Sequence, residues 1–491
     1  MRRGVDTLRL AVAIIRGHWT LLIPLALVPA FITPTKAANA ASSPNIVIIM
    51  TDDQRWDTVT SQYMPHLTRI LSQNPSITYT NAFVPNSLCC PSRTSTLTGD
   101  YSHTTGVYGN GGQWGGFMSF TLPPEGSSIS SVNDATTMAV DMQQAGYRTA
   151  LVGKYLNQYP RGHYDYVPPG WNRWFSVGTG VYYHYRAASN GKKSRLFGTA
   201  PKDYITRVLT ARATSFIDAP STKPFFLYYA TTAPHAPSIP DPRDVGRFDL
   251  NGYAQPPSFG KAEAGAPNYI QALPWDSNRV KTVNSLHKRQ LDANYGVDRS
   301  IGKVWSAIPD NTVVLFMSDN GLLWGEHRWE NKQVPYNESL RVPIMIVGKN
   351  LQTPLPSTGT DSRIVLNVDV VPTLEGMAGV VSGHPLEGLN MFTSAREDFV
   401  LEHWQGAAAQ VPTYCGIRSA DWMYVRYNKD EEAIKEGLYD ENVDPWEMNN
   451  LAVTDPADPS VATELQTMRD RAATLCQADG GLYPNDWPFP G

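Results

Sequence analysis

Two adjacent cysteines begin a run of residues whose types could do chemistry. The run is Cys89-Cys90-Pro91-Ser92-Arg93, and Leu97-Thr98-Gly99 follows it after three further residues. A cysteine thiolate is a nucleophile, a metal ligand and an oxidisable group. The pair could instead be a small apolar filler where a strand meets a helix. A thiolate zinc site is disfavoured, because no further Cys or His lies nearby at zinc-ligand spacing.

Acidic and amide side chains follow two apolar segments that are far apart in the chain. Asp52-Asp53 comes after residues 45–50, and Asp319-Asn320-Gly321 comes after residues 313–317. Taken singly, the first group is explained as a helix cap and the second as a turn. Together, their oxygen donors predict a site for a hard divalent cation. We expect Ca²⁺, with Mg²⁺ as the alternative, because Ca²⁺ accepts irregular cages of oxygen ligands.

The apolar pattern predicts an α/β fold that would bring these groups together. Buried strands are predicted at residues 45–50, 149–152, 225–229, 313–317 and 343–347, and helices at residues 64–71, 131–144, 204–217 and 286–308. Strands that alternate with helices favour a mostly parallel sheet flanked by helices. Sites in such sheets lie at the carboxyl ends of the strands. Lys154 and His235 also follow predicted strands, so we expect them at the same edge.

Composition and the N-terminal segment narrow the class of protein. Apolar content of 42% and charged content of 18% are typical of a globular protein. The formal net charge is −4 without a long basic run, so we expect no nucleic-acid partner. Residues 1–40 combine a basic start, an apolar stretch and Ala38-Asn39-Ala40, which predicts a cleaved signal peptide and no stable membrane anchor. An uncleaved anchor is the alternative; with cleavage, the chain would be secreted or periplasmic.

Two segments and the C-terminal part differ from the predicted core in composition and in the length of their predicted elements. Residues 157–200 and 237–278 are rich in Gly and Pro and are predicted to be long loops over the site. Short strands at residues 399–404, 415–418 and 423–427 and a helix at residues 461–476 follow. We expect a catalytic domain at residues 41–390 and a small α+β domain at residues 391–491. Cys415 and Cys476 could form a disulfide in an exported protein, or could remain buried thiols.

These motifs resemble those of the sulfatases, within the alkaline-phosphatase-like superfamily. The pattern Cys-x-Pro-Ser-Arg-x-x-x-Leu-Thr-Gly, starting at Cys89, matches the sulfatase signature, and residues 146–156 match a second signature. The resemblance covers nearly all of the chain after residue 40 and implies the alkaline-phosphatase-like fold, with a mixed, mostly parallel sheet. The further matching segments are Ala233-Pro234-His235-Ala236-Pro237, Gly325-Glu326-His327 leading to Lys332, Arg341-Val342-Pro343, Leu438-Tyr439-Asp440 and Asn449-Asn450-Leu451.

The resemblance also implies a reaction, the hydrolysis of sulfate monoesters. A formylglycine-generating enzyme would oxidise Cys89 to formylglycine, whose hydrate would attack the sulfur atom. A hydrate suits the task because its second hydroxyl can expel sulfate, whereas a serine would be left as a stable sulfate ester. By the same resemblance, the cation ligands would be the modified Cys89 together with Asp52, Asp53, Asp319 and Asn320. Of the remaining residues, Arg93 would hold the hydrate, His235 would assist the leaving group, and the sulfate oxygens would be bound by Lys154 and Lys332.

One position departs from the family pattern. Many sulfatases have a histidine two residues after the signature lysine, and this chain has Leu156 there. That histidine is usually assigned to deprotonating the hydrate when sulfate leaves. We expect His103 or His327 to take its place.

Short matches bear on the substrate. Residues 87–90, 153–157 and 402–406 are most similar to those of the N-acetylglucosamine-6-sulfatases, which favours a sulfated carbohydrate substrate. A generic arylsulfatase acting on aryl sulfate is the near alternative. Two others are a phosphonate or phosphodiester hydrolase on the same fold, and a sulfated-glycan-binding protein in which Cys89 is never oxidised.

Overall fold

The computed structural model describes residues 43–112, 114–121, 132–250, 254–405, 410–428, 434 and 436–476. The predicted signal peptide at residues 1–40 lies outside these residues. Within the described part of the chain, no helix combines the length and the apolar character needed to cross a membrane.

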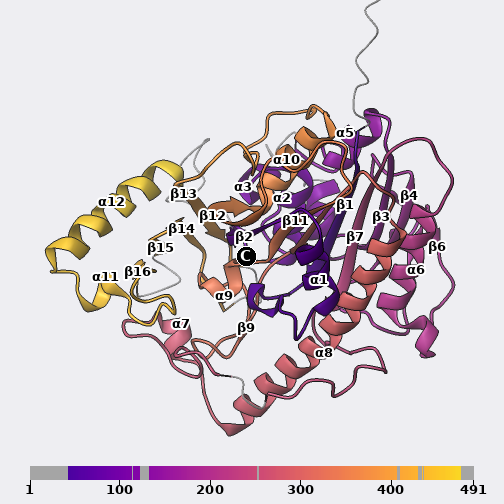
Figure 1. Ribbon diagram of the computed structural model, residues 1–491. Coiled ribbons are helices and arrows are strands. Elements are labelled where there is room, and N and C mark those ends of the chain that lie inside the picture. The colour runs from indigo at the N-terminus through magenta and orange to yellow at the C-terminus, as the bar shows by residue number, and fades with distance from the viewer. Residues whose placement is uncertain are drawn as a thin grey trace, which may run out of the picture. The chain divides into compact units, whose positions relative to one another are not determined.

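A ten-stranded sheet forms the centre of the fold (Figure 1). The four central strands β8, β1, β7 and β3 are parallel, and β11 runs antiparallel to both of its neighbours. The sheet is therefore mixed and mostly parallel, as the resemblance implied. The strands in spatial order are β12 (Gly359–Leu366), β2 (Ser76–Phe83), β11 (Ile344–Lys349), β8 (Thr312–Ser318), β1 (Asn45–Asp52), β7 (Phe225–Pro234), β3 (Arg148–Lys154), β4 (Arg173–Val177), β5 (Ala188–Ser189) and β6 (Lys192–Lys193).

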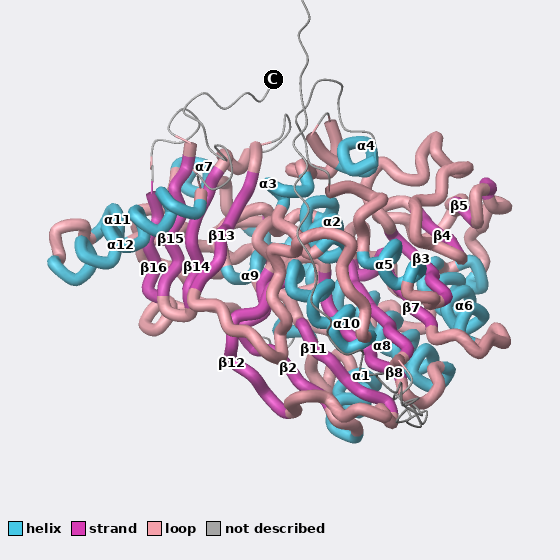
Figure 2. Tube along the Cα trace, turned by 90° about the horizontal axis from the view of Figure 1, so that it is seen from above, coloured by secondary structure: helices cyan, strands magenta, loops and turns pink. Residues whose placement is uncertain are grey.

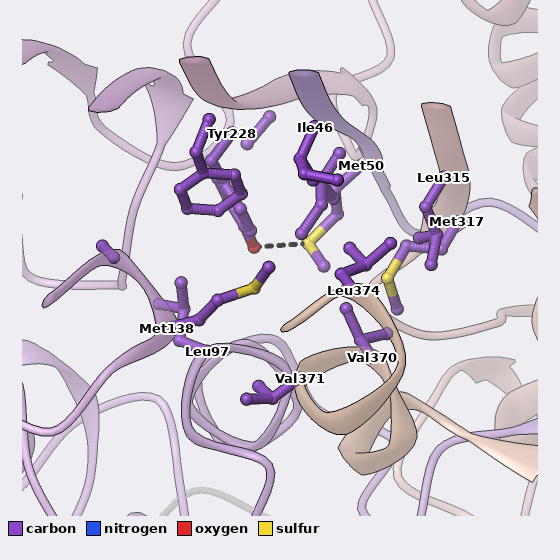
Figure 3. Close-up of a cluster of buried hydrophobic side chains, with 14 of the residues drawn as sticks. Ile46, Met50, Leu97, Met138, Tyr228, Leu315, Met317, Val370, Val371 and Leu374 are labelled. Atoms are coloured by element: carbon purple, nitrogen blue, oxygen red, sulfur yellow. Dashed lines mark hydrogen bonds between the residues drawn. The ribbon is translucent and has the colours of Figure 1, made fainter. Parts of the chain in front are cut away.

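Helices cover both faces of this sheet because alternate side chains of a strand point to opposite faces. In β1, Ile46 and Met50 pack on one face against α2 (Cys89–Thr98), α5 (Met138–Gln144) and α10 (Val370–Ala378), as Figure 3 shows. Val47 and Ile49 point to the other face and pack in a second apolar cluster. The helices of that second face are α1 (Pro65–Gln73), α6 (Ile205–Ile217) and α8 (Ser277–Ala307).

A second, smaller sheet follows in the C-terminal part of the chain (Figure 2). Its four antiparallel strands are β13 (Asp398–His403), β14 (Tyr414–Ser419), β15 (Trp422–Tyr427) and β16 (Glu436–Asp440). Helix α12 (Pro459–Leu475) packs against it through an apolar stripe that includes Leu465 and Met468. Cys415 of β14 and Cys476, directly after α12, form a disulfide. The structure thus selects the disulfide over the two free thiols.

The remaining elements are short. The helices among them are η1 (Trp56–Thr58), α3 (Ser102–Thr105), α4 (Gly116–Thr121), η2 (Pro201–Asp203), α7 (Asn268–Gln271), α9 (Asn337–Leu340), η3 (Asn367–Asp369) and α11 (Leu451–Thr454). Strands β9 (Leu323–Trp324) and β10 (Glu330–Asn331) form a separate antiparallel pair.

All five strands predicted for the core are present, and three details of the prediction are wrong. The helix predicted from residue 131 begins at Met138, after a turn, and the helix predicted from residue 286 begins at Ser277, where Asp276 caps its first turn. The segment 157–200 is not all loop, because it contributes β4, β5 and β6 to the sheet. Trp174 and Phe175 of β4 are buried, which explains the pairing.

Candidate active site

Helix α2 carries the cysteine motif, and all ten of its residues are buried despite their polar character. Its threonine hydroxyl groups bond within the helix: Thr94 donates to the carbonyl of Cys90 at 3.0 Å, and Thr98 to that of Thr94 at 2.9 Å. The helix ends at Gly99, which has a φ of +83°. Cys89 is the first residue of the helix, so its side chain lies at the positive end of the helix dipole.

The remaining site residues follow the ends of the four central strands. Asp52 ends β1, Lys154 ends β3, and Asp319 and His235 follow β8 and β7. Gly153 precedes the lysine with a φ of +131°, where a Cβ would lie 1.6 Å from the carbonyl oxygen of Ala230 in β7. Only glycine permits this close approach of the two strands.

The oxygen donors predicted to bind a cation lie side by side. The backbone N–H of Asp53 donates to Asp319 Oδ1 at 3.1 Å, and Asn320 Nδ2 donates to Asp53 Oδ1 at 2.8 Å. The Sγ of Cys89 lies 3.7 Å from Asp52 Oδ1. The structure therefore brings together all five residues that the sequence analysis assigned to the cation, although 267 residues separate Asn320 from Asp53.

Two lysines balance the charge of this acidic group. Lys154 Nζ donates to both oxygens of Asp52, at 2.7 and 2.9 Å. Lys332 Nζ donates to Asp53 Oδ1, to Cys89 Sγ at 2.9 Å and to Asn320 Oδ1 at 3.2 Å. Although burial alone would raise the pKa of Asp52, Lys154, then His235 and Arg93, lower it to about 2.

Arg93 links the helix to the strand ends. Its Nε donates to Asp319 Oδ2 at 2.8 Å, and one Nη donates to the carbonyl of Lys154 at 3.1 Å. The other Nη, buried and 3.8 Å from Asp52 Oδ1, has no hydrogen-bond partner among the described residues. One donor of the guanidinium is therefore free to bind a further anion or hydroxyl.

The two adjacent cysteines have opposite electrostatic environments. For Cys89, burial opposes ionisation, but Lys154 and Lys332 outweigh it and lower the pKa of the thiol. For Cys90, burial raises the pKa to about 12, and its Sγ accepts a hydrogen bond from the backbone of Asn157 at 2.9 Å. Cys89 is therefore the reactive member of the pair, and Cys90 packs as a small apolar side chain.

His235 is the partly exposed side chain of the site. Its Nδ1 lies 2.6 Å from the carbonyl oxygen of Ala236, and its Nε2 lies 3.7 Å from Asp53 Oδ2. Burial would lower the pKa of the imidazole, but Asp53 and Asp52 raise it to about 9. The ring therefore presents a protonated Nε2 to the site at neutral pH.

The two histidines expected to replace the one missing at Leu156 lie elsewhere. His103 is 2.8 Å from Glu402 and 3.5 Å from Glu387, and His327 is 3.1 Å from Glu263. No hydrogen bond or ion pair within the described residues joins either one to Cys89. Leu156 itself is buried in the apolar cluster.

One positioning residue was missed by the sequence analysis. Asn367 Nδ2 donates to the carbonyl and to the hydroxyl of Ser92, at 2.9 and 3.1 Å, and so anchors the first turn of α2. A single asparagine after a strand carries no signal in the sequence.

His235 could also serve as a ligand of the cation, because its ring nitrogen lies within 4.8 Å of ligand atoms of Asp52, Asp53 and Cys89.

The donor set fits a hard divalent cation. The carboxylates are held in place by the lysines and the backbone, and their oxygens converge beside the Cys89 side chain. Carboxylate and amide oxygens are the ligands that Ca²⁺ and Mg²⁺ prefer. The arrangement can therefore place a cation, two ammonium groups and a guanidinium around the Sγ atom of Cys89.

Comparison with known proteins agrees with this geometry. The sulfatase family model matches residues 44–380, and a model described as the C-terminal part of N-sulphoglucosamine sulphohydrolase matches residues 325–474. An extracellular sulfatase Sulf-1 homolog of Caenorhabditis elegans is 30% identical over 71% of this chain and 49% of its own length. The human N-acetylglucosamine-6-sulfatase is 27% identical over 91% of this chain and 88% of its own length.

A solved structure shares the fold. That protein, in complex with its substrate D-glucosamine-2-N,6-O-disulfate, superposes with a TM-score of 0.72 and 22% identity, over 91% of this chain and 100% of its own. The chain spans about half the length of the Sulf-1 homolog. By the family model, which matches most of its length, the chain belongs to the sulfatase family.

Proposed function

We propose that this protein hydrolyses sulfate monoesters with a formylglycine formed from Cys89 and with one bound Ca²⁺. The observation that carries the proposal is the position of Cys89 Sγ, next to Asp52 and within 2.9 Å of the ammonium of Lys332. The hydrated formylglycine would supply the nucleophilic hydroxyl, and the cation would neutralise sulfate oxygens. Asp52, Asp53, Asp319 and Asn320 are the residues that would hold that cation.

The cations of the chain bind and orient the sulfate group. Lys154 is fixed by the two oxygens of Asp52, so its third N–H group is available to a sulfate oxygen without reorganisation. Lys332 directs its N–H groups to Asp53, Asn320 and Cys89, so a sulfate oxygen would replace the Cys89 sulfur as its third acceptor. Arg93 uses its unpartnered Nη to hold the hydroxyl groups at position 89. Burial of these groups excludes water, which strengthens each interaction with the substrate.

His235 provides the proton for the departing alcohol. Its Nδ1–H donates to the carbonyl of Ala236, which directs Nε2 toward Asp53 and the site. A proton on Nε2 neutralises the leaving oxygen as its bond to sulfur breaks. This help matters most for sugar sulfates, because an alkoxide leaves less readily than a phenolate.

For the substrate, we propose a sulfated sugar of the N-acetylglucosamine-6-sulfate type. The support comes from the relatives, since the human protein matched over most of its length is named an N-acetylglucosamine-6-sulfatase. The solved structure with D-glucosamine-2-N,6-O-disulfate agrees in substrate class. We further propose export by the segment 1–40, in line with relatives named extracellular, and maturation by a formylglycine-generating enzyme.

The test combines peptide mass spectrometry with sulfate release. Material made with the maturation enzyme should show position 89 as an aldehyde and should release sulfate from glucosamine-6-sulfate faster than from aryl sulfate or phosphonate esters. The variant Cys89→Ala should be inactive, and the matched control Cys90→Ala should retain turnover. An unmodified Cys89 in active material would refute the formylglycine proposal, and a preference for phosphonate esters would favour the rival hydrolase.

A further inference from the structure

A second group of potential metal ligands lies outside the site just described. It consists of His327, Glu338 and Glu447, all buried, with one ligand atom of each within 4.8 Å of the other two. His327 follows β9, Glu338 lies in α9, and Glu447 follows β16. Two segments that are near in the sequence, around residues 327 and 338, therefore meet a distant third around residue 447. The meeting point lies between the candidate active site at the strand ends (the strand-end site) and the small C-terminal sheet.

The inward-facing atoms of this group have no partner. His327 Nε2, Glu338 Oε2 and Glu447 Oε2 are buried without a hydrogen bond to any described residue. His327 Nε2 and Glu447 Oε2 are 4.0 Å apart, which is too long for a hydrogen bond. Buried polar atoms are almost always satisfied, so three unsatisfied atoms that face one another indicate a ligand.

The outward-facing atoms, in contrast, are firmly held. His327 Nδ1 lies 3.1 Å from Glu263 Oε2, and Glu447 Oε1 accepts from the backbone N–H of Asn337 at 2.9 Å. A histidine whose other ring nitrogen donates to a carboxylate is the usual arrangement at a metal site, because it fixes the tautomer that leaves Nε2 free to coordinate. The Nε2 lone pair then faces two carboxylate oxygens and no donor.

We propose that His327, Glu338 and Glu447 bind a second divalent ion, of the Zn²⁺ class, with a structural role. A point central to the three ligand atoms lies within roughly 2.8 Å of each, so a contraction of less than about 1 Å reaches the zinc–ligand distances of roughly 2.0–2.2 Å. An imidazole with two carboxylates favours a first-row transition ion over Ca²⁺.

The position of the ion explains what it would stabilise. Lys332 lies in the segment between His327 and Glu338, so two of the three ligands bracket the residue that contacts Cys89. Arg55, two residues after Asp53, donates to Glu326 at 2.5 Å beside this group. The ion would therefore join the segment that carries Lys332 to the C-terminal sheet, through Glu447. It would in this way stabilise the position of Lys332 in the strand-end site.

Metal analysis of the full chain tests this inference. Elemental analysis of protein purified without chelator should find about one transition-metal ion per chain in addition to Ca²⁺. Glu338→Gln and Glu447→Gln should each lower the transition-metal content at least tenfold and leave Ca²⁺ unchanged. The matched control is Glu375→Gln, a change at a buried acid outside both groups, which should leave both metals in place.

Two measurements keep the test independent of folding and of the proposed reaction. Crystals of the unaltered protein should give an anomalous peak at the zinc edge between His327 and Glu447. Cys89→Ala should keep this ion even though it loses turnover. Absence of the peak, or full metal content in both glutamine variants, would overturn the second site while leaving sulfate hydrolysis untouched.

Discussion

Replacement of Lys154 by methionine separates binding of sulfate from binding of the cation. Lys154 is fully buried and donates to both oxygens of Asp52, at 2.7 and 2.9 Å, with Asp319 Oδ2 at 4.0 Å. Methionine keeps the length and the apolar stem of the side chain and removes only the charge. Asp52 then keeps Arg93, at 3.8 Å, as its nearest cation.

The expected magnitudes follow from burial. Breaking a buried ion pair at one partner costs about 3–5 kcal/mol, so the free energy of unfolding should fall by that amount in the absence of Ca²⁺. Loss of one fixed donor to the developing charge should lower kcat by about 10²–10³-fold. The site becomes more negative, so affinity for Ca²⁺ should rise rather than fall, and added Ca²⁺ should restore part of the stability.

The assays are urea unfolding with and without Ca²⁺, calorimetric Ca²⁺ titration and sulfate release. Lys349→Met is the matched control. Lys349 donates to two backbone carbonyls, those of Trp305 and Ile308, and it belongs to β11, outside the site. This variant should leave kcat unchanged. A Lys154→Met enzyme with unchanged kcat, or one that loses Ca²⁺, would refute the role assigned to this lysine.

Three further outcomes are expected. His235→Asn should slow release from sugar sulfates by about 10²–10⁴-fold but affect nitrophenyl sulfate far less, and equal losses on both would refute its role as proton donor. Joint replacement of Cys415 and Cys476 by alanine opens a link that spans 61 residues and should lower the free energy of unfolding in urea by up to about 4 kcal/mol. Leu156→His should lower the melting temperature, since a buried imidazole without a partner costs about 1–3 kcal/mol, and an unchanged melting temperature would contradict this.

Much of the sheet was predictable because its central strands are buried on both faces. Such strands read as continuous apolar runs, and the residues that follow them, Asp52-Asp53 and Asp319-Asn320, stand out by contrast. Parallel strands end at one edge, which was enough to group these residues before the structure was known. Strand β2, which lies between β12 and β11, was missed, because its alternating burial mixes Ser, Thr and Asn with apolar residues.

Helix α2 was not predictable from periodicity. Its sequence, CCPSRTSTLT, has no apolar stripe, and Ser and Thr are weak helix formers. The helix forms because tertiary packing buries it and its hydroxyls bond back to its own carbonyls, as Thr96 does to Ser92 at 2.8 Å. For this segment a recognised motif was more informative than propensity.

The buried group around His327 was beyond sequence reasoning for a different reason. Its ligands are 11 and 109 residues apart, without the short spacing that identifies a metal motif. Glu338 and Glu447 are adjacent only because α9 and the turn after β16 meet, through the hydrogen bond from Asn337. Contacts between segments that are distant in the sequence leave no local pattern that could be recognised.

The charges of the strand-end site explain how so many ionised groups can be buried together. Three carboxylates are matched by the three cations that contact them, and the protonated His235 adds one further positive charge before any ligand arrives. In the proposed reaction, a divalent cation would add two positive charges, which the negative charges of a sulfate monoester and of an ionised nucleophile at position 89 would offset. Loss of a carboxylate should therefore weaken binding of the cation first, and loss of a lysine should weaken binding of the sulfate first. The groups concerned are Asp52, Asp53, Asp319, Arg93, Lys154 and Lys332.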